Sequence, residues 1–475
     1  MNLKVRRVIY LAFIAVFFIS GSLLLLYLQG FRYNPTKGKL ERTGAILVET
    51  IPEKATVKLN SLVQADTTPL SLNSLKPGEY EVEIELAGYQ PWQKILPVRP
   101  SEVTFASSVR LWPATNTGMA LGVGKSPLTA LSPNRQNLLY FVPSGLTNGL
   151  WLLNLTSGQT SLLRRPAGST VTSLEWSATS REVLVAESDN GSTRWQIYTL
   201  DSREWEPVEL PSELAPSQIH WGEEKQLLYA ATANELYQLN RRTSSSKLLW
   251  REKLKDFRVH DGIIFGLTRG SGEAVLLKLI TLSNLQPVPM AESLTLSTNP
   301  AFQQAIGDWL PLLDEDRHVL YLLRSPLTSS APLRSLPDVT SLDWDSEATK
   351  LLLSNNFEVW EYELAAGEVT FLERVSTSLQ QARLLEGYPY VLMASGNEVW
   401  ALELDGRGER QRWLLASYDT PVRNLFLDPA GELLVVQTEN DFYRLELTST
   451  SQPDEPPTSL LEEAIRTYRR LSTLP

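Results

Sequence analysis

The amino-acid sequence predicts a mainly β protein with an N-terminal transmembrane helix, a small β-sandwich, a β-propeller and a short C-terminal helix. Two observations carry most of this prediction. Residues 8–31 form an uncharged apolar run. Further along, a short apolar phrase recurs, and from Trp151 to Tyr443 its seven intervals average about 42 residues. That period is typical of a four-stranded propeller blade.

Composition excludes several classes of protein. The chain has 475 residues, a formal net charge of −10 and no cysteine. A nucleic-acid binder would carry a basic face, so we expect no nucleic-acid partner. Without cysteine there can be no disulfide, no thiolate catalysis and no zinc site built on Cys ligands.

The apolar run at residues 8–31 is long enough to cross a bilayer as a helix, and Tyr10 and Tyr27 lie where interfacial aromatic residues are common. A cleaved signal peptide or a buried helix is the alternative. We interpret the run as an uncleaved signal anchor, with residues 1–7 as a cytoplasmic tail and residues 32–43 as a linker. Basic residues flank both ends of the run almost equally, so the charge bias favours neither orientation strongly.

Residues 44–113 form a compact β domain. In residues 80–86, apolar and acidic residues alternate, which places Tyr80, Val82 and Ile84 on one buried face of a strand. The other predicted strands are residues 45–49, 56–60, 94–98 and 103–111. About 70 residues with one apolar face per strand predict a small sandwich.

This domain resembles the PEGA domain. The resemblance rests on Pro52-Glu53-Lys54-Ala55, Thr68-Pro69-Leu70, Leu75-Lys76-Pro77-Gly78-Glu79-Tyr80 and Gly88-Tyr89, in that order. The sequence departs from the family at Lys54, where glycine is usual, and at Asn60-Ser61-Leu62, where a glycine turn is common. The resemblance implies a non-catalytic, extracytoplasmic binding or spacer module of prokaryotic surface proteins.

The repeats occupy residues 114–447. Copies of the apolar phrase lie at 150–155, 196–200, 235–239, 275–279, 319–323, 358–362, 398–402 and 441–445. These eight units predict eight blades. Because the units at 254–290 and 296–335 are degenerate, seven blades remain an alternative.

The last unit lacks an outer strand, which residues 117–125 could supply by closing the ring. The strand-and-turn pattern resembles the PD40 repeats of TolB-like propellers, which are WD40-like, with Asp428-Pro429-Ala430-Gly431 as the best match.

The C-terminal residues have a different composition. Residues 448–458 are a linker rich in Ser, Thr and Pro, and Ser459 opens a capping box for an amphipathic helix over 459–472. Leu461, Ala464, Ile465, Tyr468 and Leu471 share one face of that helix, and Arg466, Arg469 and Arg470 follow its acidic start. We expect this helix to pack on the propeller; binding a partner or a membrane surface is the alternative.

The sequence contains little that resembles catalytic chemistry. Glu175, His220 and Asp343 occupy one repeat position beside the recurring tryptophans, so they are candidates for lining the central channel. The simpler interpretation is that they are ordinary polar residues beside the core. No catalytic motif, metal site or cofactor site is predicted, and no nucleotide partner.

These features predict a membrane-anchored extracytoplasmic binding or scaffold protein of a bacterial or other prokaryotic cell envelope. It would sit in the cytoplasmic membrane as a single-pass protein and engage a protein or a cell-wall polysaccharide, without catalysis. The alternative is an envelope enzyme, a glycan or peptide hydrolase or lyase with its site in the propeller funnel. An assembly role by analogy with TolB-like propellers is a third hypothesis.

Overall fold

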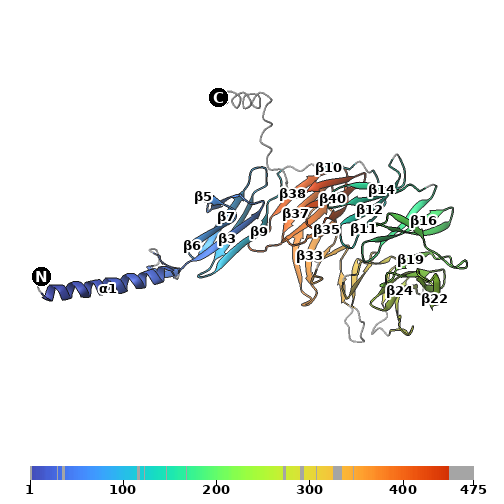
Figure 1. Cartoon of the computed structure of the whole chain (residues 1–475), viewed down its shortest axis with the longest axis horizontal. Coiled ribbons are helices and arrows are strands. Elements are labelled where there is room, and N and C mark those ends of the chain that lie inside the picture. Colours follow the sequence, from blue (N-terminus) through green and yellow to red (C-terminus); the bar gives the residue numbers. More distant parts are fainter. Residues whose placement is uncertain are drawn as a thin grey trace, which may run out of the picture.

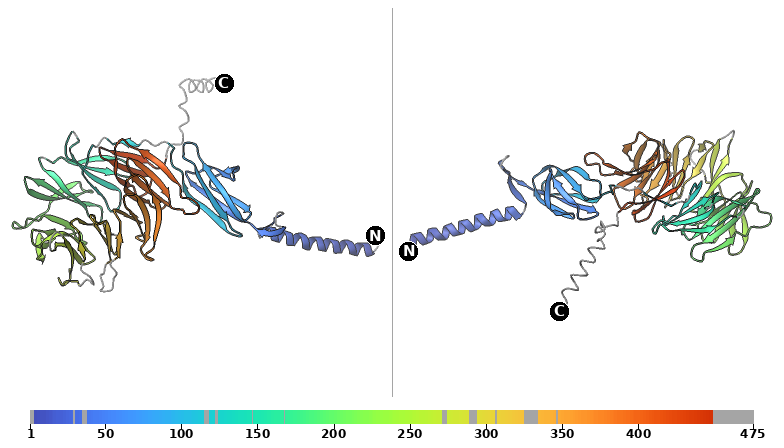
Figure 2. Two further views of the ribbon diagram at one scale, coloured as in Figure 1. Left: turned by 180° about the vertical axis from the view of Figure 1, so that it is seen from behind. Right: turned by 90° about the horizontal axis from the view of Figure 1, so that it is seen from above.

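The computed structural model arranges a helix, a small β domain and a larger β domain in a row (Figures 1 and 2). It describes residues 3–28, 30–34, 38–114, 118–121, 124–145, 147–166, 168–270, 274–288, 294–305, 307–324, 334–345 and 347–448. The predicted linker 448–458, except for its first residue, and the predicted helix 459–472 lie outside these residues.

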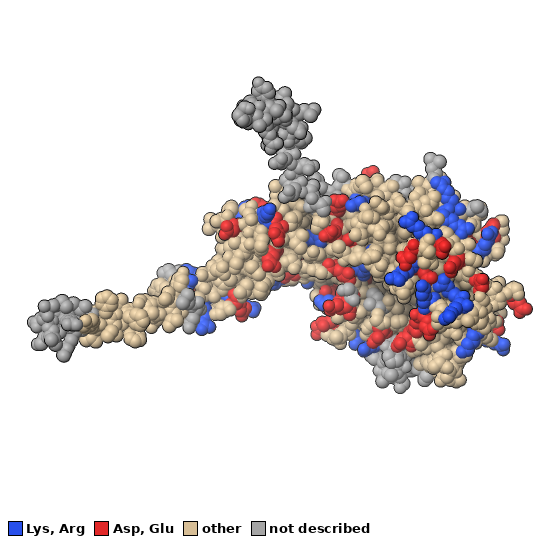
Figure 3. Space-filling model, in the orientation of Figure 1, with Lys and Arg blue, Asp and Glu red and all other residues tan. Residues whose placement is uncertain are grey.

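Helix α1 spans Leu3–Leu28, and none of its Tyr10–Tyr27 portion is buried in the structure. Its 26 residues extend about 39 Å, more than the roughly 30 Å of a hydrocarbon core. The Tyr10–Tyr27 portion contains no charged residue, whereas charges of both signs are interspersed on the propeller (Figure 3). The helix is therefore long and apolar enough to span a membrane.

Two predicted boundaries near the helix are wrong. The helix ends at Leu28 rather than at residue 31, and part of the predicted linker 32–43 is a hairpin. Its strands are β1 (Phe31–Asn34) and β2 (Lys39–Arg42). Gly30, at φ 80°, turns the chain out of the helix, and the Arg32 guanidinium donates to the Tyr27 carbonyl at 2.8 Å.

The small domain is a sandwich of two sheets, as predicted. One sheet has the order β6-β3-β9 and the other β5-β4-β7-β8. The strands are β3 (Gly44–Ile51), β4 (Thr56–Leu59), β5 (Leu62–Thr67), β6 (Leu70–Leu75), β7 (Gly78–Glu85), β8 (Trp92–Val98) and β9 (Val103–Arg110). On β7, Val82 and Ile84 are buried as the alternation predicts. Strands β5 and β6 were not predicted because they bury almost no side chains and so lack a clear alternation.

Eight four-stranded antiparallel sheets form the propeller, which confirms eight blades over seven. Blade one consists of β11 (Leu128–Leu131), β12 (Asn137–Val142), β13 (Gly149–Asn154) and β14 (Thr160–Arg164), and blade two of β15 (Thr170–Trp176), β16 (Glu182–Asp189), β17 (Ser192–Thr199) and β18 (Glu204–Pro207). Blade three consists of β19 (Gln218–Trp221), β20 (Leu227–Ala231), β21 (Leu236–Asn240) and β22 (Ser245–Trp250). Blade four consists of β23 (Leu254–His260), β24 (Ile263–Arg269), β25 (Val275–Thr281) and β26 (Thr295–Leu296). The degenerate unit at 254–290 thus supplies most of a complete fourth blade.

Blade five consists of β27 (Pro300–Phe302), β28 (Trp309–Asp314), β29 (Val319–Arg324) and β30 (Arg334–Pro337), and blade six of β31 (Ser341–Trp344), β32 (Lys350–Ser354), β33 (Glu358–Glu363) and β34 (Val369–Arg374). Blade seven consists of β35 (Leu379–Leu385), β36 (Tyr390–Ser395), β37 (Glu398–Glu403) and β38 (Arg412–Ser417). Blade eight consists of β39 (Val422–Leu427), β40 (Leu433–Thr438) and β41 (Phe442–Glu446) with β10 (Met119–Ala120). Strand β10 pairs with β41 as the outer strand of the eighth blade, so the two ends of the domain close the ring as expected.

A buried apolar cluster lies between each pair of successive blades. The recurring tryptophans belong to these interfaces. The indole of Trp176 donates to the Ala130 carbonyl at 2.9 Å, and that of Trp221 donates to the Glu175 carbonyl at 3.1 Å, in each case in the preceding blade. These tryptophans are core packing residues, as their period predicts.

Candidate functional site

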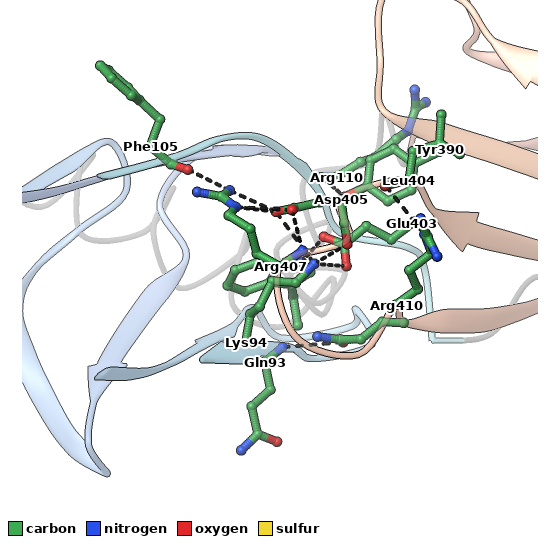
Figure 4. Close-up of polar contacts among 12 residues, drawn as sticks. Gln93, Lys94, Phe105, Arg110, Tyr390, Glu403, Leu404, Asp405, Arg407 and Arg410 are labelled. Carbon is green, nitrogen blue, oxygen red and sulfur yellow. Dashed lines mark hydrogen bonds and ion pairs between the residues drawn. The ribbon is translucent and has the colours of Figure 1, made fainter. Parts of the chain in front are cut away.

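The first feature with functional consequences is the junction between the small domain and blade seven. Lys94 lies on β8, and its Nζ is 2.6 Å from Oε2 of Glu403 on β37 (Figure 4). Only 3% of Lys94 is exposed. The same ammonium donates to the Asp405 carbonyl at 2.8 Å, and the Trp92 indole donates to Glu403 Oε1 at 3.0 Å. A buried charge pair therefore joins the two domains.

The sequence of β8 contains a pattern that indicates this contact, and the prediction of a strand over residues 94–98 did not make use of it. On β8 the residues alternate between buried and exposed, and Lys94 falls on the buried face between Trp92 and Leu96. A lysine there would be costly unless a carboxylate from elsewhere paired with it. The pattern could have indicated an interdomain contact, although the position of its partner, 309 residues away, could not be read from it.

A second contact lies at the end of β9. The Arg110 amide donates to the Tyr390 hydroxyl at 3.0 Å, and the Trp112 ring meets the Tyr390 ring edge-on, with centroids 5.4 Å apart. Trp112 is fully buried. One apolar core continues from the sandwich into blades seven and eight. The two domains therefore share a core.

The Arg110 side chain is an unusual part of this core. It is 1% exposed, and its three guanidinium nitrogens have no hydrogen-bond partner among the described residues. The guanidinium carbon lies 5.2 Å from the centre of the Trp112 ring and 5.0 Å from that of Tyr388. Burial lowers the pKa of Arg110. The faces of these aromatic rings favour its charge, as do the nearby carboxylates of Glu432 and Asp428.

A groove lies beside the junction, between β9 and the turns of blades six and seven. We call it the interdomain groove; its volume is about 1030 Å³. It is lined by Pro97, Arg99, Glu102, Val103, Thr104, Phe105, Ser107, Asp345, Glu347, Lys350, Glu361, Leu384, Leu385, Glu386, Gly387, Tyr388, Pro389, Leu404, Asp405 and Arg407. Burial acts to raise the pKa of Asp405, but its bonds with Arg407 and the Lys94 charge lower that pKa below its ordinary value. The Arg407 guanidinium also donates to the Phe105 carbonyl at 2.8 Å.

Two of the three candidate channel residues meet in the structure. His220 Nδ1 is 2.6 Å from Glu175 Oε2, and its Nε2 is 3.5 Å from Asp256 Oδ1. The Arg258 guanidinium is 2.8 Å from His220 Nε2. This cluster links the inner strands of blades two, three and four. Asp256 and Arg258 were not predicted, because β23 lacks the tryptophan that marks the repeat position in other blades.

Asp343 lies apart from them. Its Oδ1 is 3.2 Å from the Arg135 guanidinium and 3.0 Å from that of Arg383, and its Oδ2 accepts the Leu384 amide at 2.9 Å. Asp343, Arg135 and Arg383 line a cavity of about 750 Å³ between the inner strands of several blades, and neither Glu175 nor His220 lines it. The structure therefore does not gather the three residues into one site.

The histidine cluster has shifted pKa values. Burial acts to lower the pKa of His220, but the charge of Glu175 and the Asp256 hydrogen bond raise it above its ordinary value of 6.5. Burial acts to raise the pKa of Glu175 and of Asp256, and the neighbouring His220 and Arg258 lower both. The charged forms of all three groups are favoured in the folded protein.

These shifts predict a pH dependence of stability. A raised His220 pKa contributes stability below about pH 6.5, and this is lost as the pH rises through the folded-state pKa. The lowered Glu175 and Asp256 pKa values contribute stability above their ordinary values of 4.5 and 3.8, lost as the pH falls. We expect the unfolding free energy of the wild-type protein to fall as the pH rises, and that of His220→Gln to lack this decrease. Urea titrations of both proteins between pH 5 and 9 would test this. An equal decrease in the unfolding free energy of both proteins would contradict it.

Comparison with known proteins gives a family match for the small domain. Residues 43–113 match the PEGA domain. No curated protein matches the chain. Among solved structures, it is similar to a chain of the mitotic checkpoint complex (TM-score 0.41, 13% identity, 70% of this chain and 92% of that chain), to the Dos1 propeller (0.47, 11%, 70% and 96%) and to a eukaryotic initiation factor (0.48, 11%, 71% and 91%).

The propeller assignment comes from the eight four-stranded sheets rather than from these similarities. The chain thus combines an N-terminal apolar helix, a PEGA domain at residues 43–113 and an eight-bladed β-propeller.

Proposed function

We propose that this protein is a membrane-anchored, extracytoplasmic binding or scaffold protein of a prokaryotic cell envelope. The observation that carries the proposal is the shared core between the PEGA domain and the propeller. With Lys94 buried against Glu403, the PEGA domain is a fixed spacer and not a mobile module. A propeller held in this way presents the same loops, at a set distance from the anchor, to a protein or a cell-wall glycan.

The anchoring part of the proposal rests on α1. Its Tyr10–Tyr27 portion is unburied and apolar, so that in water it would expose a large apolar surface. Insertion into a bilayer covers that surface. The PEGA match favours an extracytoplasmic location for the rest of the chain, with the N-terminal tail inside.

The absence of catalysis is also part of the proposal. It is supported by Asp343, whose carboxylate is held in ion pairs with two arginines, Arg135 and Arg383, rather than left free to act on a substrate. One observation favours the enzymatic alternative, since His220 lies between two carboxylates, Glu175 and Asp256. A hydrolase or lyase acting on glycans or peptides would need substrate to reach that imidazole.

Protease accessibility tests the location directly. We expect protease added to intact cells or spheroplasts to degrade the propeller without lysis, while a cytoplasmic protein in the same sample survives. A matched variant lacking residues 2–31 should lose its membrane association. Protection of the propeller until lysis would place the body in the cytosol and overturn the proposal.

A further inference from the structure

We propose that the C-terminal segment 459–472 binds in the interdomain groove of its own chain, as an amphipathic helix. The groove has an apolar side that nothing in the described part of the chain covers. Val103 and Phe105 on β9 are 49% and 54% exposed, and they line the groove together with Leu404 and Leu385. Apolar side chains gathered in a concave surface are typical of a site for a helix face.

The edge of the sheet contributes to the same surface. Strand β9 is the outer strand in the order β6-β3-β9, so one side of it has no strand partner among the described residues. The Phe105 carbonyl on that side is held by Arg407, which also binds Asp405 at 2.7 Å. The arginine fixes the position of β9 relative to blade seven, and the groove is therefore formed before any ligand binds.

The lining of the groove is also acidic. Six acidic and three basic side chains line the groove. Several of these charges are already paired, such as Lys350 with Glu361 at 2.8 Å. Glu347 and Glu386 form no ion pair within the described residues, so the groove presents negative charge beside its apolar side. The complementary ligand is an apolar helix with basic residues at one end.

The chain itself contains such a segment. Residues 459–472 combine an apolar face with a basic end. The face consists of Leu461, Ala464, Ile465, Tyr468 and Leu471, and the basic residues are Arg466, Arg469 and Arg470. In the predicted helix Arg469 lies beside the apolar face, where it can reach a carboxylate on the rim of a groove, whereas Arg466 and Arg470 lie on the opposite side of the helix.

The end of the propeller places this segment within reach. The Leu447 amide donates to the Glu432 carbonyl at 2.8 Å. The adjacent Gly431 packs against Leu385, which lines the groove; a Cβ at Gly431 would lie 2.9 Å from the Leu385 side chain. Residues 449–458 can span up to roughly 33–36 Å. The linker is thus long enough to carry the segment from blade eight into the groove.

Engineered disulfides in the full chain, purified in detergent, test this proposal. The native chain has no cysteine, so a disulfide can form only between introduced residues. We expect Phe105→Cys with Tyr468→Cys to form an intramolecular disulfide under mild oxidation. The control pairs Tyr468→Cys with Phe371→Cys on β34, which is similarly exposed at 50%. This pair should form a disulfide at least tenfold more slowly.

Charge reversal adds a second readout. Glu347→Lys with Glu386→Lys should slow the Phe105 disulfide about fivefold, because the attraction between these carboxylates and the basic end of the segment is lost. Glu224→Lys, in the equivalent turn of blade three, should leave its rate unchanged. Equal rates for the Phe105 and Phe371 pairs would overturn the proposal. So would a disulfide-linked dimer, which would show that the segment of a second copy occupies the groove. Neither outcome bears on the membrane location proposed above.

Discussion

Lys94→Met will destabilise the folded protein by about 3–5 kcal/mol, because it leaves the Glu403 carboxylate buried without its cation. Side-chain exposure is 1% for Lys94 and 4% for Glu403, so water cannot replace the lost partner. Chemical denaturation of the full chain in detergent, followed by tryptophan fluorescence, would measure the loss. Trp92 donates to Glu403 and so reports on the same site.

Two variants distinguish a buried charge pair from a general loss of packing. Adding Glu403→Gln to Lys94→Met should restore most of the stability, since the amide oxygen can still accept from Trp92 without a buried charge. Lys278→Met removes a lysine that is also paired with a carboxylate, since its Nζ is 2.8 Å from Glu252 Oε2, but whose side chain is 43% exposed. We expect it to cost less than about 1 kcal/mol. A similar loss for Lys94→Met and Lys278→Met would contradict the account.

Trp112→Ala will cost about 3–5 kcal/mol and will separate the unfolding of the two domains. The Trp112 ring is fully buried between the sandwich and blade seven, where it meets Tyr390 and the Arg110 guanidinium. Removing the ring leaves a cavity in the core that the two domains share. In calorimetry, one transition of the wild-type protein should become two.

Trp176→Ala serves as the matched control. Trp176 is also buried, at 7% exposure, but it lies between blades one and two. Its loss should destabilise the protein to a similar extent while leaving the number of transitions unchanged. If Trp112→Ala unfolds in a single transition like Trp176→Ala, the shared core does not couple the domains.

Most of the fold could be predicted from the sequence, because strand patterns and repeat periods are local properties. The alternation in residues 80–86 identified β7, and the 42-residue period identified eight blades even where two units were degenerate. Strands β5 and β6 were missed since their side chains are mostly exposed and show no alternation. The hairpin at 31–42 was missed for the same reason.

The candidate site could be predicted only in part. The repeat position placed Glu175, His220 and Asp343 on inner strands, but it does not say which of them are neighbours. Glu175 and His220 come from successive blades and meet, whereas Asp343 comes from blade six and pairs with arginines. The junction was not predicted, because its partners are separated by about 300 residues. The alternation on β8 indicates that Lys94 needs a partner but does not say where in the chain that partner lies.

The central claim is that the PEGA domain and the propeller are one rigid body. The most direct test is to measure distances between spin labels in the two domains. Labels at Leu62→Cys on β5 and Phe371→Cys on β34 would both be exposed, and the chain has no other cysteine. We predict a single narrow distance distribution in detergent, which broadens when Trp112→Ala is added. A broad distribution in the otherwise unchanged protein would show that the domains move independently, and would contradict the account.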